Sequence, residues 1–168
     1  TPLQTGMSDW PVMPRRDGES EWYSADPNLV GADFFHAYQM EIVEGRGFEP
    51  ADAEREPAPV ILNRHGASRL FGDQPAVGQF VNLSFGEPVW REVIGVVEDI
   101  RGRGLAQEPT VQTYMTFGSG PFASNPSLML NIRGDVGAES LRRAVTDVVG
   151  AIDSEIPVGP VRGMEAVI

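Results

Sequence analysis

The sequence predicts an α+β fold in two lobes, and three observations support that prediction. Over residues 1–125, short apolar runs bounded by turn residues alternate with short helical segments, which is typical of a mixed or antiparallel sheet with few helices. Over residues 126–168, a strand, a helix of about four turns and a second strand form the pattern of a βαβ unit. Residues 118–126, rich in glycine, serine and proline, predict a linker where the chain changes lobe.

The first lobe begins with residues 1–20, which predict an irregular segment with one short strand. Aromatic residues at 21–25 predict a strand, which a turn at Asp26-Pro27-Asn28 ends. Residues 32–38 predict a short helix, because their aromatic side chains fall on one face. A strand over residues 41–44 and a loop over residues 49–59 follow.

The clearest local signal in the first lobe is a buried strand followed at once by a helix. Residues 60–62 form a fully apolar run, and Asn63 is a suitable N-cap for a helix over residues 64–71 that Gly72 ends. Residues 79–85 and 89–98 then predict a hairpin, and residues 110–117 a further strand.

The second lobe contains the most regular segment of the chain. A strand over residues 128–133 precedes a helix over residues 138–152, and a strand over residues 158–162 follows. The apolar residues of that helix recur at helical spacing and predict one buried stripe, formed by Leu141, Val145, Val148 and Ile152.

Composition excludes several kinds of chemistry. The chain has 168 residues, a formal net charge of −11, no cysteine and no lysine, since all 13 basic residues are arginine. Thiol nucleophiles, disulfides, cysteine-ligated metals, Schiff-base lysines and phosphate-loop lysines are therefore absent. The acidic balance argues against a nucleic-acid partner, and no run is long enough to span a membrane. Because the chain starts at Thr1 without a signal peptide, we expect it to be a piece of a longer polypeptide.

The candidate catalytic residues do not form a convincing set. His36 and His65 lie on predicted short helices, where we expect surface or half-buried positions. His65 and Ser68 lie one helical turn apart but lack the strand–turn–helix elbow of serine hydrolases. Glu98 and Asp99 are neighbours at a strand end and should point to opposite faces, as expected of a solvated end.

Two further charged segments are weighed as sites. Asp52, Glu54 and Glu56 alternate along a loop, but the calcium-loop pattern is absent, so the sequence predicts simple solvation there. Arg101 and Arg103 form the densest basic spot, which predicts a turn able to contact a carboxylate or a lipid headgroup of a partner. No catalytic residue, cofactor or metal ligand is predicted, and Arg101 and Arg103 are the proposed contact residues.

The order and spacing of several short motifs resemble a known family. They include Val30-Gly31-Ala32-Asp33-Phe34-Phe35, Gly45-Arg46-Gly47-Phe48, Val60-Ile61-Leu62-Asn63, residues 90–101 (WREVIGVVEDIR) and residues 152–158 (IDSEIPV). Together these resemble the MacB-like periplasmic core domain of ABC transporter permeases of the MacB/FtsX/LolC type, including the predicted acidobacterial-type permeases. The resemblance covers nearly the whole chain.

The resemblance implies a domain inserted between two membrane helices and facing the periplasm or outer surface. It implies a Sabre-like lobe over residues 1–125 and the C-terminal half of a porter-like βαβ lobe over residues 126–168, with the first porter half missing or reduced. It implies no catalytic role. The resemblance also implies that a separate cytoplasmic ATPase hydrolyses ATP and that the outer domain transmits conformational change for export. Implied partners are the membrane helices of the parent permease, that ATPase, a second permease copy in a homodimer or pseudo-dimer, and an adaptor or other envelope protein.

Two alternatives stay open on the sequence. The chain is also compatible with a stand-alone periplasmic module that binds a small molecule or lipid, and with a hydrolase that uses His65 or the carboxylates. In the permease reading, the absence of cysteine fits an oxidising exterior. The charge of −11 then predicts repulsion from an anionic membrane surface.

Overall fold

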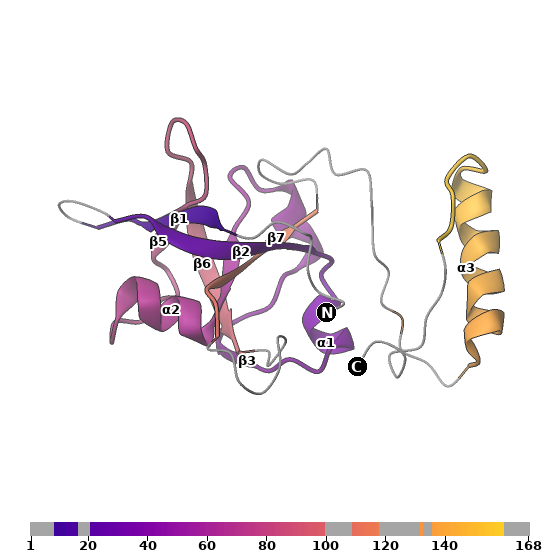
Figure 1. Cartoon of the computed structure of the whole chain (residues 1–168), viewed down its shortest axis with the longest axis horizontal. Helices are drawn as coiled ribbons and strands as arrows, with labels where there is room; N and C mark the ends of the chain where they lie inside the picture. The colour runs from indigo at the N-terminus through magenta and orange to yellow at the C-terminus, as the bar shows by residue number, and fades with distance from the viewer. Residues whose placement is uncertain (1–8, 17–20, 100–108, 118–131, 133–135, 160–168) are drawn as a thin grey trace. The chain divides into compact units, whose positions relative to one another are not determined.

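The computed structural model of the chain describes residues 9–16, 21–99, 109–117, 132 and 136–159 (Figure 1). In these residues, sheet strands outnumber helices, and three of the four helical elements are short, which confirms the α+β class. The elements are β1 (Trp10–Pro14), β2 (Tyr23–Val30), α1 (Phe34–Ala37), β3 (Ile42–Gly45), the 3-10 helix η1 (Pro50–Glu54), β4 (Val60–Asn63), α2 (Arg64–Phe71), β5 (Phe80–Asn82), β6 (Trp90–Val97), β7 (Gln112–Thr116) and α3 (Ala138–Ile152).

The chain divides into two compact units, Leu3–Leu130 and Thr1–Pro2 with Asn131–Ile168. The strands β1 to β7 belong to the first unit, and α3 belongs to the second. The linker predicted at 118–126, and with it the lobe boundary between residues 125 and 126, lies outside the described residues. So do most residues of the strands predicted over 128–133 and 158–162. The two-lobe division and the βαβ unit therefore stay predictions.

The sheet of the first unit closes on itself. The strand order is β3-β6-β4-β7-β2-β1-β5, and β5 also pairs with β6, so six strands form a closed ring with β3 attached to β6. The β2–β7 and β4–β6 pairs are parallel, and the other pairs are antiparallel. The predicted hairpin is confirmed, because β5 and β6 pair in register from Phe80↔Glu92 to Asn82↔Trp90.

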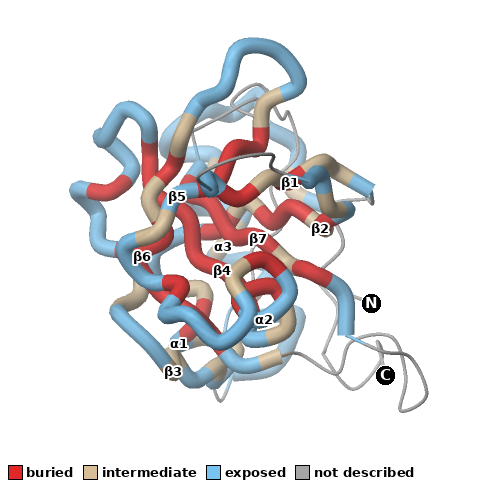
Figure 2. Tube along the Cα trace, turned by 90° about the vertical axis from the view of Figure 1, so that its left-hand side faces the viewer, coloured by how far each residue is buried: buried red, intermediate tan, exposed pale blue. Residues whose placement is uncertain are grey.

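The closed sheet separates two hydrophobic clusters. The larger cluster includes Val12, Leu62, Val81 and Val96, together with Leu70 from α2. The smaller includes Ile61, Val97 and Tyr114, and α1 contributes Phe35 to it. Neighbouring residues of β4 thus point to different clusters, as the alternation of a strand requires. Figure 2 shows buried segments gathered along the central strands, with exposed chain around them.

Asn63 joins four segments at the end of β4. Its Oδ1 accepts hydrogen bonds from the backbone N–H groups of Gly66 (3.0 Å) and Gln112 (2.8 Å). Its Nδ2 donates to Asp99 Oδ1 (2.6 Å) and to the carbonyl oxygen of Thr110 (2.9 Å). The predicted N-cap of α2 is therefore confirmed, and the same side chain also fixes the end of β6 and the start of β7.

β3 and β6 approach each other through a pair of glycines. A Cβ at Gly95 would lie 2.2 Å from the carbonyl oxygen of Arg46, and a Cβ at Gly45 would lie 2.2 Å from the carbonyl oxygen of Ile94. Gly45 also has a φ of +68°, a conformation that side chains with a Cβ rarely adopt. Only glycine fits at both positions.

An ion cluster holds η1 against the sheet. The Asp52 side chain is 3% exposed and accepts hydrogen bonds from Arg46 Nη1 (2.6 Å) and Nη2 (2.9 Å). The Glu49 backbone N–H also donates to Asp52 (2.8 Å), and Arg55 Nη1 lies 3.6 Å from Asp52 while its Nη2 bonds Glu92 (2.7 Å). The predicted solvation of Asp52 is therefore wrong, because two arginines and a backbone donor compensate its burial.

The predicted turn at Asp26-Pro27-Asn28 is also wrong, since these residues lie within β2. The backbone N–H of Asp26 points to β7 and donates to the carbonyl of Val111 (2.8 Å), so the nitrogen of Pro27 faces the β1 side. The described pairs between β1 and β2 run from Val12↔Tyr23 to Trp10↔Ala25, so Pro27 interrupts none of them.

The helices predicted over residues 32–38 and 138–152 agree with the structure to different extents. The helix predicted over residues 32–38 is only the single turn Phe34–Ala37. The helix predicted over residues 138–152 has the predicted bounds in α3. Its apolar stripe is not buried among the described residues: Val148 is 63% exposed and Ile152 is 78% exposed.

Replacing Asn63 should destabilise the chain strongly. We expect Asn63→Ala to lower the free energy of unfolding by about 3 kcal/mol, because it removes a helix cap and leaves buried backbone donors unpaired. Asn63→Asp retains the acceptor but places a second carboxylate against Asp99, so its defect should shrink at acidic pH. Urea unfolding measures both, with the exposed Ser68→Ala on the same helix as the control. Equal stability of Asn63→Ala and Ser68→Ala would show that the junction is unimportant.

The glycine contact between β3 and β6 gives a second expectation. Gly95→Ala should lower the free energy of unfolding by about 2 kcal/mol, because its methyl group would meet backbone that has to move. Gly47→Ala is the matched control, since a Cβ there has nothing within 4 Å. Thermal unfolding of the two variants side by side tests this, and a Gly95→Ala variant as stable as Gly47→Ala would contradict the close approach.

The Asp52 ion cluster predicts a pH dependence. The hydrogen bonds from Arg46 are the main cause that lowers the pKa of Asp52 from 3.8 to about 2. Since the folded-state pKa is depressed, this stabilisation is present above about pH 4 and is lost as the pH falls toward 2, and it amounts to about 2 kcal/mol. The stability difference between the wild-type chain and Asp52→Asn should therefore shrink over that range in urea unfolding. Glu54→Gln, an exposed neighbour, should show no such trend.

Candidate functional site

The candidate catalytic side chains are not brought together. His36 is exposed on α1, and His65 is half-buried at the start of α2, as predicted. The described side chains of His65 and Ser68 share no hydrogen bond. Glu98 pairs with Arg64 (2.8 Å) in solvent, whereas Asp99 turns inward and also accepts from the backbone N–H of His65 (2.9 Å). The predicted separation of these neighbours is thus confirmed, but Asp99 belongs to the helix cap rather than to a solvated end.

No described group of three or more histidine or acidic side chains is placed to hold a metal ion. Of the acidic loop, Asp52 belongs to the ion cluster described above, and Glu54 and Glu56 are exposed.

Arg101 and Arg103, the predicted contact residues, lie outside the described residues. The structure does describe the chain on both sides of them. Asp99 and Thr110 are both bonded to the Asn63 amide, and Thr110 Oγ1 also donates to Asp26 Oδ2 (2.7 Å). The segment that carries both arginines therefore leaves and re-enters the sheet at one fixed place.

The sequence did not indicate that Tyr114 and Arg91 are buried polar groups, because the strands that carry them have an ordinary apolar or amphipathic pattern. Burial, and secondarily the charge of Asp99, raises the pKa of Tyr114. Burial lowers the pKa of Arg91, which is 5% exposed and donates to the carbonyl of Ala58 (2.8 Å). Both groups serve the packing of the sheet.

Aromatic side chains gather at the turn of the β5–β6 hairpin. The rings of Trp10 and Phe85 meet edge to face with centroids 4.5 Å apart, and Trp10 Nε1 donates to the carbonyl of Leu83 (2.7 Å). Phe85 is nevertheless 72% exposed. The guanidinium of Arg15 stacks on Phe80 and Trp90, 5.9 and 5.7 Å from the ring centroids. We call this set the hairpin aromatic cluster.

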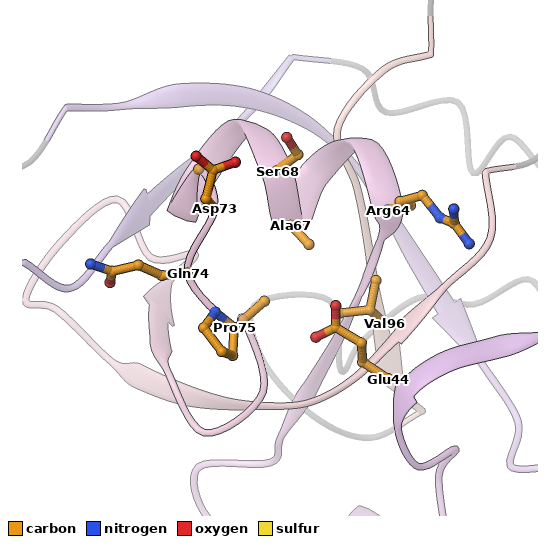
Figure 3. A pocket seen from close by; sticks show the side chains of 10 residues that line it. Glu44, Arg64, Ala67, Ser68, Asp73, Gln74, Pro75 and Val96 are labelled. Atoms are coloured by element: carbon orange, nitrogen blue, oxygen red, sulfur yellow. The ribbon is translucent and has the colours of Figure 1, made fainter.

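A second surface feature is an open groove between α2 and β3, with a volume of about 280 Å³ (Figure 3). Its apolar floor contains Ala67, Ala76 and Val96, all of them largely buried. The acidic side chains of Glu44 and Asp73 stand on opposite sides of it. We call it the α2–β3 groove. It is built from distant segments, so the sequence did not indicate it.

None of the described helices has the length and apolar character needed to cross a bilayer. The described part of the chain thus has a closed sheet that carries an exposed aromatic cluster and an open groove on its surface. Its candidate catalytic side chains do not meet in one site.

Comparison with known sequences gives matches to ABC permeases. A macrolide export ATP-binding/permease protein MacB 1/2 of Paracoccus denitrificans is 31% identical over 138 residues, which is 80% of this chain and 20% of that protein. A MacB protein of Chromobacterium violaceum is 34% identical over 88 residues, which is 52% of this chain and 13% of that protein. The chain spans about a fifth of the length of the first relative.

Solved structures share the fold. The periplasmic region of MacB from Actinobacillus actinomycetemcomitans superposes with a TM-score of 0.59 at 16% identity, covering 84% of this chain and 63% of that one. The extracellular domain of the noncanonic ABC-type transporter YknZ from Gram-positive bacteria superposes with a TM-score of 0.56, also at 16% identity, covering 91% of this chain and 76% of that one.

The profile of the MacB-like periplasmic core domain matches residues 6–148, which is most of the chain and includes every strand and helix of the first unit. The chain belongs to the MacB-like periplasmic core domain family.

Proposed function

We propose that this chain is the non-catalytic periplasmic domain of an ABC transporter permease, where it transmits conformational change and docks partners during export. The observation that supports this most directly is the family match over residues 6–148. In this proposal the chain works with the membrane helices of its parent permease and a cytoplasmic ATPase. A permease homodimer or pseudo-dimer and an adaptor or other envelope protein complete the assembly.

The physical requirement for such a role is a lobe that moves as one body. The closed ring of six strands meets it, because every ring strand is bonded on both sides and cannot peel away singly. The Asn63 junction ties α2, β6 and β7 to this ring. Force applied at one end of the sheet is therefore carried by hydrogen-bonded strands rather than absorbed by loops.

The lobe assignment is part of the proposal. We infer that residues 1–125 form a Sabre-like lobe and residues 126–168 the C-terminal half of a porter-like βαβ lobe. The exposed apolar stripe of α3 supports this, since a helix with an unburied apolar face needs further chain to pack against. Arg101 and Arg103 are the contact residues that we propose, on a segment whose two ends are fixed by Asn63.

The stand-alone binding module is the less favoured function. The relatives are permeases, and the groove is open rather than an enclosed pocket of the kind that buries most of a small ligand. Because two relatives are named macrolide export proteins, macrolides are the first substrate class to test.

The permease role is tested in the full-length polypeptide, expressed with its ATPase in a macrolide-sensitive bacterium. Replacing residues 1–168 by a short glycine–serine linker should abolish efflux while ATP binding by the ATPase remains, because the outer domain supplies no nucleotide site.

Arg101→Gln with Arg103→Gln should reduce efflux at normal expression, whereas Arg142→Gln with Arg143→Gln, exposed on α3, should not.

Ligand binding by the isolated chain tests the alternative function, the stand-alone binding module. Neither Mg-ATP nor a macrolide should raise its melting temperature by more than about 1 °C, because the proposed role assigns this domain no tight site for either ligand. A large stabilisation by a macrolide would favour the binding module, and efflux that survives the linker replacement would overturn the permease role.

A further inference from the structure

We propose that the α2–β3 groove docks an extended segment of a partner protein, which adds to the edge of β3 and places a lysine or arginine side chain in the groove. The proposal deepens the docking part of the proposed function and rests on it only in assuming a protein partner.

The first support is the edge itself. β3 pairs only with β6 among the described strands, through Ile42↔Val97, Glu44↔Val96 and Gly45↔Gly95. Each strand of the closed ring has a neighbour on both sides, so β3 is the one described strand whose second edge faces no other strand. Such an edge presents backbone donors and acceptors that an extended segment can pair with.

The second support is the position of the groove beside that edge. Glu44 and Val96 are register partners, so their side chains share the face of the sheet that meets α2. A side chain from an added strand reaches this face at every second residue. The floor formed by Ala67, Ala76 and Val96 suits the aliphatic stem of a long basic side chain, whose charged end then stays near water.

The third support is charge. Glu44 and Asp73 stand on opposite sides of the groove and take part in no ion pair with described residues (Figure 3). Arg64, the basic residue of the lining, is paired with Glu98 at 2.8 Å and extends away from the groove. The chain as a whole carries a formal charge of −11. A cationic side chain is therefore attracted to this groove and an anionic one is repelled.

The test uses the isotope-labelled chain and a capped pentapeptide of alternating valine and threonine with arginine at its centre. Titration followed by NMR should shift the amide signals of Val43, Gly45, Ala67 and Ser68. The same peptide with a central glutamate should bind about tenfold more weakly, because it loses two attractive contacts and gains repulsion. Alternate N–H groups of the bound peptide point toward β3. Methylating those nitrogens should abolish binding, because it removes the donors that pair with the strand.

Variants of the chain test whether the preference for the arginine peptide comes from the groove carboxylates or from the acidic charge of the chain as a whole. Glu44→Gln with Asp73→Asn should weaken the arginine peptide by less than tenfold, because it removes the two attractions without adding a repulsion, and on this variant the arginine and glutamate peptides should bind equally well. Glu54→Gln with Glu87→Gln, which removes two exposed carboxylates outside the groove, should leave the preference intact.

Unchanged affinity in the Glu44→Gln, Asp73→Asn variant would overturn the proposal. So would failure of the arginine peptide to bind, or signal shifts confined to Phe85 and the hairpin aromatic cluster. Because none of these measurements uses transport, such a failure leaves the permease role standing, and a loss of the permease role leaves peptide binding to be judged separately.

Discussion

The Asn63 side chain is the interaction on which the first unit depends. It ends β4 at 1% exposure, and all of its hydrogen-bonding capacity is directed at three other segments: α2, the end of β6 and the start of β7. No other residue type offers two acceptor and two donor directions in so short a side chain. Helix position, parallel pairing of β4 with β6 and the entry of β7 into the sheet are thereby fixed together.

The closure of the sheet and the Asp52 ion cluster stabilise the first unit together with this junction. Parallel neighbours such as β2 and β7 are distant in sequence, so their pairing closes a long stretch of chain, and the Asn63 junction lies within that stretch. Gly45 and Gly95 then allow β3 to lie close to β6. The loop beyond them is held by the buried carboxylate of Asp52 and its two arginines, so polar contacts secure the outer layer while apolar clusters fill both faces.

Local patterns predicted local structure well. The cap at Asn63, the helix that follows it, the β5–β6 hairpin and the bounds of α3 all depend on residues within a turn or two of one another. The predictions that failed depended on contacts between segments that no local pattern shows. The sequence around Pro27 predicts a turn, but its pairing with β7 makes it part of a strand. The sequence around Asp52 predicts a solvated side chain, but Arg46 bonds it and compensates its burial. The groove and the hairpin aromatic cluster arise from juxtaposition alone. Of the candidate site, the sequence predicted an exposed or half-buried position for His36 and His65, but not these surfaces.

The bonds from Asn63 to both Asp99 and Thr110 have a consequence for how such a domain can change in sequence. Asp99 and Thr110 bond the same amide nitrogen, so the described residues on both sides of the intervening segment are held together by the Asn63 side chain. Lengthening a segment closed in this way costs only about 0.6 kcal/mol per doubling of its length. The position is therefore suited to insertions and to changes of sequence, which lets one scaffold acquire new contacts while its folding stays nearly constant.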